Sequence, residues 1–270
     1  MSTERLIPRI IDLEANIQDE DQVIVFSKRI ENGFTQRPTS FVKFICELIG
    51  TLIFVFFGAG CAAKYPDLLT VSTAHGLVTI WLVYVFGPIS GGHFNAGVTI
   101  AFALTGKMKK YEIIGYLISQ CIGALIAGAF LLLLYDKTTG LGTPTLALGT
   151  TTVLQGFFIE FLCTMFISFI IFFTTTYQSH KEAALPIGLA VFSSFLVGAD
   201  RDGAALNVWR WLGPAVASQT FKYYSWIYIA GPIGGFIVGY IAFFLYRRIW
   251  NWNIQQLILA NPFRGYRCSC

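Results

Sequence analysis

Residues 90–101 read SGGHFNAGVTIA, and residues 203–210 read GAALNVWR. Each stretch leads into a short apolar run, near 95–105 and 207–217. About 11 residues make roughly 16 Å of helix, half the thickness of a bilayer core. Asn is a favoured N-cap, so Asn95 and Asn207 mark helix starts. We interpret both runs as re-entrant half-helices rather than interfacial loops, since such helices are tolerated at membrane depth where protein or a water-filled cavity surrounds them.

Six longer apolar runs surround these two. A helix that crosses a bilayer needs about 20 mostly apolar residues. The sequence therefore predicts six transmembrane helices, at roughly 41–63, 73–89, 112–135, 153–176, 185–200 and 225–247.

The chain is an internal repeat. Asn95 and Asn207 lie 112 positions apart, and each follows a Gly-Leu pair that begins 19 residues earlier, at Gly76 and Gly188. Glu47 and Glu160 open the first and fourth spans, each with Thr four residues later. Three spans in each half, an odd number, require the second half to be inverted in the membrane. Inverted repeats place their functional site near the midplane, where broken helices point their N-termini inward.

Composition excludes several classes of protein. Of 270 residues, 55% are hydrophobic and 13% charged, and the mean hydropathy is +0.62. A soluble enzyme carries about twice that share of charged residues. The net charge of +4 is too small to indicate a nucleic-acid partner. The sequence has no nucleophile–base pair, phosphate-binding loop or metal-spaced cluster, so we expect no enzyme, catalytic residue, metal or cofactor.

Lys and Arg placement predicts the orientation and the domains. Basic residues concentrate in both tails and in the loops after the first half-helix and the fourth span, which puts both termini in the cytoplasm. We expect a cytoplasmic N-terminal tail at 1–40, a channel domain at 41–249 with repeats at 41–135 and 153–249, and a cytoplasmic C-terminal tail at 250–270. A short helix near 10–17 and palmitoylation of Cys268 or Cys270 are further hypotheses.

These motifs resemble the major intrinsic protein family, the aquaporins and glycerol channels, over about residues 41–249. The family carries Asn-Pro-Ala once in each half, whereas this sequence has Asn-Ala-Gly at 95–97 and Asn-Val-Trp at 207–209. The resemblance implies an all-α membrane protein with six spans and two half-helices, assembled as a homotetramer in the plasma membrane or an internal membrane. It also implies that Asn95 and Asn207 donate hydrogen bonds to a passing solute at the midplane. Pro at the first helical position mainly presets φ, so its loss should affect rigidity more than chemistry.

The resemblance further implies a selectivity filter on the outer side of the midplane. Its four positions correspond to His75, Phe195, Ala204 and Arg210. Arg210 would repel cations, Phe195 would supply an apolar wall, and Ala204 would leave one corner wide. His75 alternatively faces away from the lumen and bonds a neighbouring helix.

Four other residues receive roles outside the filter. Glu47 and Glu160 are expected to accept hydrogen bonds from the re-entrant loops, and His93 to order the first of these loops. Trp209 replaces a small residue of the family motif, so its indole either wedges between helices or narrows the pore.

The leading functional hypothesis is a passive channel that conducts water and excludes ions and protons, with ammonia and hydrogen peroxide as further candidate solutes. One alternative is a channel for small uncharged solutes such as glycerol or urea, if Ala204 and the lost prolines widen the bore. The other is a structural, partner-binding membrane protein with a closed pore, which Trp209 would favour. The expected partners are water, small neutral solutes and the lipid bilayer, and the N-terminal tail is a candidate plug.

Overall fold

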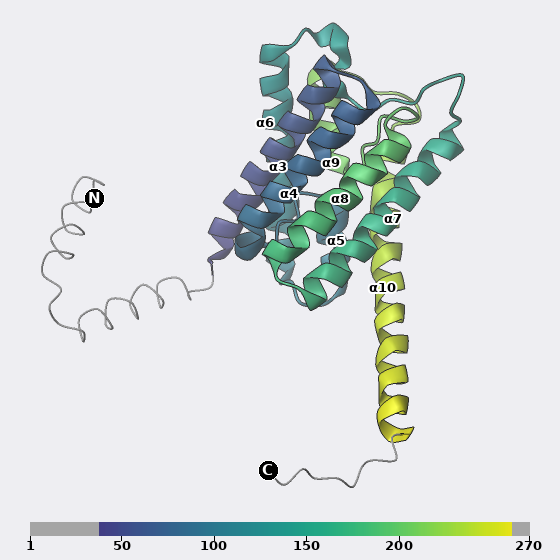
Figure 1. The fold of residues 1–270 in the computed structure, drawn as a ribbon. Coiled ribbons are helices and arrows are strands. Elements are labelled where there is room, and N and C mark those ends of the chain that lie inside the picture. Colours follow the sequence, from purple (N-terminus) through teal and green to yellow (C-terminus); the bar gives the residue numbers. More distant parts are fainter. Residues whose placement is uncertain (1–37, 261–270) are drawn as a thin grey trace, which may run out of the picture. The chain divides into compact units, whose positions relative to one another are not determined.

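The computed structural model describes residues 38–260, with side-chain surroundings through Asn251. The predicted helix near 10–17 and Cys268 and Cys270 lie outside these residues. Every regular element from Ser40 onward is helical (Figure 1).

Between residues 38 and 260, six helices are long and apolar enough to cross a membrane, which confirms the predicted fold class. In chain order they are α3 (Ser40–Lys64), α4 (Leu68–Ser90), α6 (Lys110–Leu134), α7 (Val153–Tyr177), α8 (His180–Gly198) and α10 (Ile227–Ala260). A short 3₁₀ segment, η2 (Lys137–Gly142), follows α6. The end of the bundle that carries η2 is called the η2 end below.

Two short helices complete the bundle, α5 (Ala96–Leu104) and α9 (Val208–Ser218). Each begins directly after an Asn in extended conformation. The Asn95 Oδ1 accepts from Gly97 N at 2.9 Å, and the Asn207 Oδ1 accepts from Trp209 N at 3.0 Å. The caps satisfy N–H groups that a helix start leaves without intrahelical partners. Asn therefore starts both half-helices without the help of proline.

Close helix packing in the two halves obeys the repeat. A Cβ at Gly123 of α6 would lie 2.3 Å from Leu48 O of α3, and one at Gly235 of α10 would lie 2.2 Å from Phe161 O of α7. The halves meet through Gly76 and Gly188, where a Cβ on either glycine would approach the carbonyl oxygen of the other within 3.1 Å. Glycine lets these backbones touch, as in other membrane helix pairs.

Several helix ends differ from the predicted spans. α4 begins at Leu68 rather than 73 because Asp67 caps it, with Oδ1 accepting from Thr70 N at 2.9 Å. α8 begins at His180 rather than 185 because Ser179 and Glu182 form a capping box. α10 continues to Ala260, so the predicted boundary at 249–250 falls inside a helix. Apolar runs mark the part of a helix inside the bilayer and miss its polar first and last turns.

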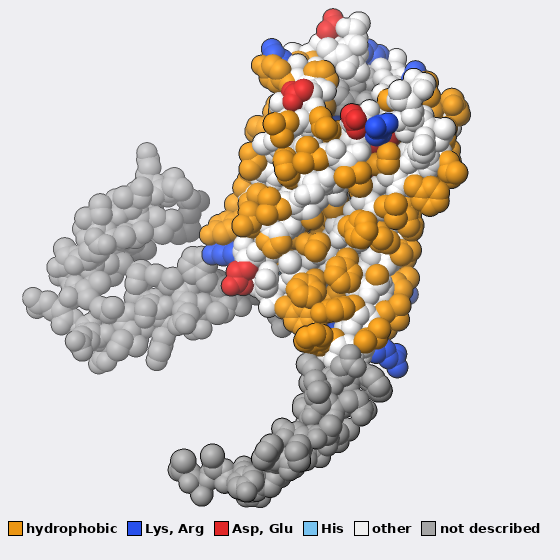
Figure 2. Space-filling view, turned by 45° about the vertical axis from the view of Figure 1, so that its right-hand side comes forward, with side chains coloured by type: hydrophobic (Ala, Val, Ile, Leu, Met, Phe, Trp, Pro, Cys, Tyr) orange, Lys and Arg blue, Asp and Glu red, His pale blue; other side chains and the backbone are white. Residues whose placement is uncertain are grey.

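The surface of the bundle suits a bilayer. Figure 2 shows hydrophobic side chains spread over the middle of one face, with Lys, Arg, Asp and Glu gathered toward its two ends. Large side chains such as Leu133, Phe166 and Leu189 are more than half exposed. An apolar band of this kind is rare on soluble monomers.

We predict that Gly123→Val and Gly235→Val each destabilise the bundle by about 1–3 kcal/mol or more, because the added methyls overlap backbone. Thermal unfolding in detergent measures the effect. Ile122→Val is the matched control, since Ile122 neighbours Gly123 but is 43% exposed. Equal melting temperatures for the glycine variants and the control would contradict the packing argument.

Candidate functional site

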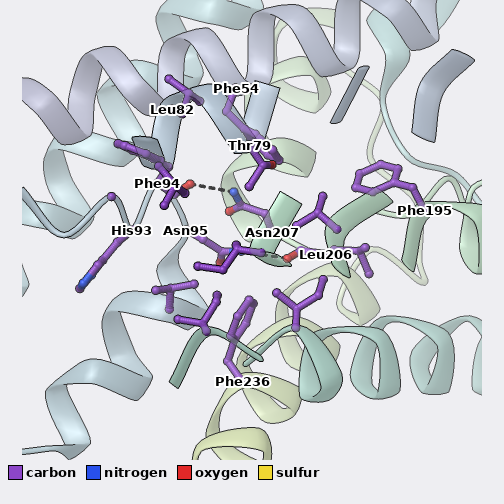
Figure 3. Close-up of a pocket in the computed structure, with 17 residues that line it drawn as sticks. Phe54, Thr79, Leu82, His93, Phe94, Asn95, Phe195, Leu206, Asn207 and Phe236 are labelled. Carbon is purple, nitrogen blue, oxygen red and sulfur yellow. Dashed lines mark hydrogen bonds between the residues drawn. The ribbon is translucent and has the colours of Figure 1, made fainter. Parts of the chain in front are cut away.

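The tips of the two half-helices meet at the centre of the bundle. The Asn95 Nδ2 donates to Leu206 O at 2.9 Å, and the Asn207 Nδ2 donates to Phe94 O at 2.8 Å, as the dashed lines of Figure 3 mark. Each side chain thus holds the loop that precedes the opposite half-helix. An Asn amide has two N–H groups and each bond uses one. The other N–H of each Asn makes no hydrogen bond within the part of the chain that the structure describes.

Both asparagines line a cavity of about 60 Å³, called the central cavity here. Most of its wall is apolar, with Leu82, Ile187 and Phe236 among the side chains around it. Thr79 and His93 are the other polar side chains on the wall. A small molecule here finds few hydrogen-bond partners besides the asparagines.

Glu47 of α3 holds the first re-entrant loop. It is fully buried, and its carboxylate accepts from His93 N at 3.0 Å and Phe94 N at 2.8 Å. Ser90 Oγ and Gln120 Nε2 donate to the same carboxylate, at 2.6 and 2.8 Å. Four donors around one buried carboxylate offset its loss of hydration.

Glu160 of α7 holds the second loop in the equivalent way. Its two oxygens accept from Ala205 N at 2.6 Å and Leu206 N at 2.7 Å. No side chain among the described residues donates to it, so its support is weaker than that of Glu47. A second buried carboxylate, Asp202, caps the same loop by accepting from Ala204 N at 2.9 Å.

Three of the four predicted filter residues are in contact between the central cavity and the η2 end. The His75 ring of α4 stacks on the Phe195 ring of α8, with centroids 3.7 Å apart and an interplanar angle of 20°. Arg210 Nε donates to His75 Nε2 at 3.2 Å. His75 Nδ1 lies 2.8 Å from Val71 O, which can only accept, so Nδ1 carries the ring proton and Nε2 is free to accept.

The neighbours of this group fix its position. A Cβ at Gly58 would lie 2.3 Å from His75 Nε2, so α3 leaves room for the ring only because it has glycine there. Arg210 Nη1 donates to Gly142 O, at 2.6 Å, at the end of η2. Arg210 is 1% exposed, yet it also borders a second cavity of about 260 Å³ at the η2 end, the vestibule.

The stacked rings separate the two cavities. The vestibule and the central cavity share no lining residue, and both His75 and Phe195 are fully buried between them. Phe195 lines the central cavity, and His75 bonds Arg210, which lines the vestibule, so the stacked pair bridges the two walls.

Ala204, the fourth predicted filter residue, lies in the loop before α9 with a φ of 43°. Its side chain packs into the hydrophobic core and lines neither cavity. The predicted widening of the filter by Ala204 therefore gains no support from the two cavities.

Trp209 wedges between helices. Its indole Nε1 donates to Gln120 Oε1 of α6 at 2.9 Å, and the residue does not line the central cavity. The Gln120 Nε2 group donates to Glu47 and to Thr99 Oγ1, which fixes the orientation of the amide. Gln120 thus links the support of the first re-entrant loop to the start of α9.

His93 both orders its loop and borders the central cavity. Its ring stacks on Phe102 with centroids 4.7 Å apart, and Nδ1 lies 3.2 Å from Thr99 Oγ1. Two residues of the site, Gln120 and Phe236, were not predicted from the sequence. Gln120 opens segment 120–123, which matches 232–235 at the repeat offset of 112, and that match is the signal that could have found it. Phe236 was one of many Phe residues, although the 112-residue offset from Ala124 places it in register.

Comparisons with known proteins agree with this architecture. Residues 35–246 match the family model described as Major intrinsic protein. Nodulin-26 of Glycine max is 32% identical over 244 residues, covering 84% of this chain and 88% of the relative. Aquaporin NIP1-2 of Arabidopsis thaliana is 36% identical over 73% of this chain and 71% of its own length, and Aquaporin-5 of Ovis aries is 33% identical over 76% and 81%. The X-ray structure of the aquaglyceroporin from Plasmodium falciparum superposes with a TM-score of 0.68 at 20% identity, covering 75% of this chain and 94% of that one.

We predict that Glu47→Ala lowers stability more than Glu160→Ala, because it strands four donors rather than two. Each stranded buried donor costs about 1–3 kcal/mol. Melting temperatures in detergent rank the two variants. Asp200→Ala is the control, since that carboxylate is half exposed. The reverse ranking, or a loss no larger than in the control, would refute the supporting roles.

Proposed function

We propose that this chain, which belongs to the major intrinsic protein family, is a passive channel that conducts water. Its membership makes it an integral membrane channel rather than an enzyme. One observation carries the choice of solute: two asparagines, each with one amide N–H that bonds no described residue, line a small, mostly apolar cavity. Ammonia and hydrogen peroxide resemble water in size and polarity, and the same reasoning extends to them.

The central cavity supports a file of small polar molecules. Its volume of about 60 Å³ leaves room for a short chain of waters. A water at the centre donates poorly to an apolar wall, so it orients its oxygen toward the asparagine N–H groups. That orientation is reversed on the two sides of the centre, because two helix N-termini converge there.

Cations face a barrier at two successive levels. The Arg210 guanidinium lies beside the constriction, and the positive ends of both half-helix dipoles lie at the centre. Arg210 and the central asparagines offer hydrogen bonds to water without compensating the desolvation of a cation. This combination supports the passage of water and the exclusion of ions.

The geometry weakens the arguments for the two alternatives. Ala204 packs into the core, so it gives no reason to expect a bore wide enough for glycerol. Trp209 bonds Gln120 outside the cavity, so it gives no reason to expect a blocked pore. The closed His75–Phe195 stack is the remaining argument for a closed channel, and a transport measurement decides it.

The orientation in the membrane and the assembly are part of the proposal. Of the twelve Lys and Arg side chains between residues 38 and 251, seven lie at the end opposite η2, namely Lys43, Lys107, Lys109, Lys110, Lys181, Arg247 and Arg248. We infer that this end faces the cytoplasm together with both termini. By analogy with the family we expect four copies to assemble, each with its own pore, in the plasma membrane or an internal membrane.

We predict that proteoliposomes with the wild-type chain shrink under osmotic stress faster than empty liposomes in stopped-flow light scattering. The same vesicles should show no added conductance for Na⁺ or protons. Rates equal to those of empty liposomes would remove the channel proposal and favour a structural, partner-binding protein with a stack that stays closed.

We predict that Arg210→Val keeps or raises water flux and raises cation leak at least about tenfold. A unit charge 4 Å away is worth about 4 kcal/mol at an effective dielectric constant of 20, and the variant removes it. Ion flux across the same proteoliposomes measures the leak. Arg201→Val is the matched control, because it removes an exposed Arg that pairs with Asp200 at the same end of the bundle. Equal leak in the two variants would contradict the assigned role of Arg210.

A further inference from the structure

We propose that Phe236 is a specificity-determining residue, a second barrier in series with the His75–Phe195 constriction that excludes solutes larger than water at the centre of the pore. This inference rests on the proposed function and names the step that limits its substrate range. The Phe236 side chain comes from α10 and borders the central cavity, whose wall also includes both asparagines (Figure 3). It is 1% exposed.

The main chain of Phe236 is held against α7. Ser168 Oγ of α7 donates to Phe236 O at 2.7 Å. The glycine just before it, Gly235, brings α10 into backbone contact with α7, and Gly239 does so one turn later. The α10 backbone therefore cannot shift relative to α7 without losing these contacts.

The ring of Phe236 is seated on Gly97, the second residue of α5. A Cβ at position 97 would lie 2.3 Å from Phe236 Cδ2 and 2.9 Å from Cγ. No real side chain tolerates such a contact, so any larger residue at 97 would push the ring. Since the α10 backbone is held against α7, the ring itself would have to turn, and the central cavity is the open space that it borders.

The two halves of the repeat carry their large side chain at different positions. Position 97 corresponds to Trp209, and Phe236 corresponds to Ala124, each pair 112 residues apart. In the second half-helix the large side chain belongs to α9 and bonds Gln120 outside the cavity. In the first half-helix the residue is Gly, and the large side chain belongs to α10 and borders the cavity. The large side chain that borders the central cavity is therefore Phe236 and not Trp209.

A phenyl wall at this point selects by size and by desolvation. It offers no hydrogen bond, and it faces a cavity in which the asparagines provide two N–H donors. A water passes with one oxygen acceptor turned to these donors. A polyol such as glycerol must bring several hydroxyl groups past the ring and leaves most of them without partners, which costs free energy for each group.

The test compares glycerol and water permeability of proteoliposomes in a background where the first barrier is removed. His75→Ala widens the constriction, and we expect it to remain a poor glycerol channel because Phe236 still limits the pore. Adding Phe236→Ala should raise glycerol permeability at least about tenfold, with Phe236→Leu between them. His75→Ala with Phe243→Ala is the control, since Phe243 is a buried α10 phenylalanine that does not border the cavity. Glycerol flux as high in His75→Ala alone as in the double variant would overturn the proposal.

A second comparison tests the seat of the ring through water flux. Gly97→Ala should lower water permeability at least several-fold, and Phe236→Ala in the same chain should restore it. Size-exclusion chromatography checks that the Gly97→Ala variant is folded like the wild type. If it is, and Phe236→Ala does not restore its water flux, the proposed contact between Phe236 and Gly97 does not control the pore. If Gly97→Ala does not fold, the glycerol comparison still decides the matter. A wild type that conducts no water overturns the channel proposal itself and with it this inference. A wild type that conducts water, with equal glycerol permeability in His75→Ala and in His75→Ala with Phe236→Ala, overturns this inference alone.

Discussion

Two helix N-termini buried at the centre of a membrane protein create the constraint that organises this fold. Each start leaves backbone N–H groups without intrahelical acceptors, and hydrocarbon offers no water to satisfy them. The reciprocal bonds from Asn95 to Leu206 O and from Asn207 to Phe94 O join the two tips. The same side chains cap their own helices. The fully buried Glu47 and Glu160 then accept the N–H groups of the preceding loops, so the whole tip-to-tip contact is hydrogen-bonded.

The loss of both prolines is compatible with this arrangement because proline supplies φ and no hydrogen bond. Ala96 and Val208 begin their helices behind Asn caps without it. The Trp209 indole adds a contact that a small residue could not make. Through Gln120 it connects α9 to Glu47 and hence to the first re-entrant loop. The two half-helices are therefore connected by a network of side-chain hydrogen bonds as well as by the asparagines.

The sequence predicted the fold well because its strongest signals have a single physical reading. Long apolar runs give the six spans, and an Asn before a run too short to cross gives the start of each half-helix. The support glutamates were placed by register in the repeat and the filter residues by the resemblance to the family, and their functional roles remain proposals. Helix ends at Leu68, His180 and Ala260 were missed because caps and polar turns leave no apolar signal. The side-chain directions of Trp209, Ala204 and Phe236 were beyond reach, since each depends on which neighbouring backbone has a glycine or an amide at the contact.

The proposed function depends above all on one claim: each central asparagine keeps an amide N–H free for the solute. A density map of the channel in lipid, at a resolution that reveals ordered water, tests it most directly. We expect water oxygens within about 3 Å of both Asn95 Nδ2 and Asn207 Nδ2, in a row that continues along the apolar wall of the central cavity. A dry central cavity, or asparagine amides bonded only to protein, would contradict it.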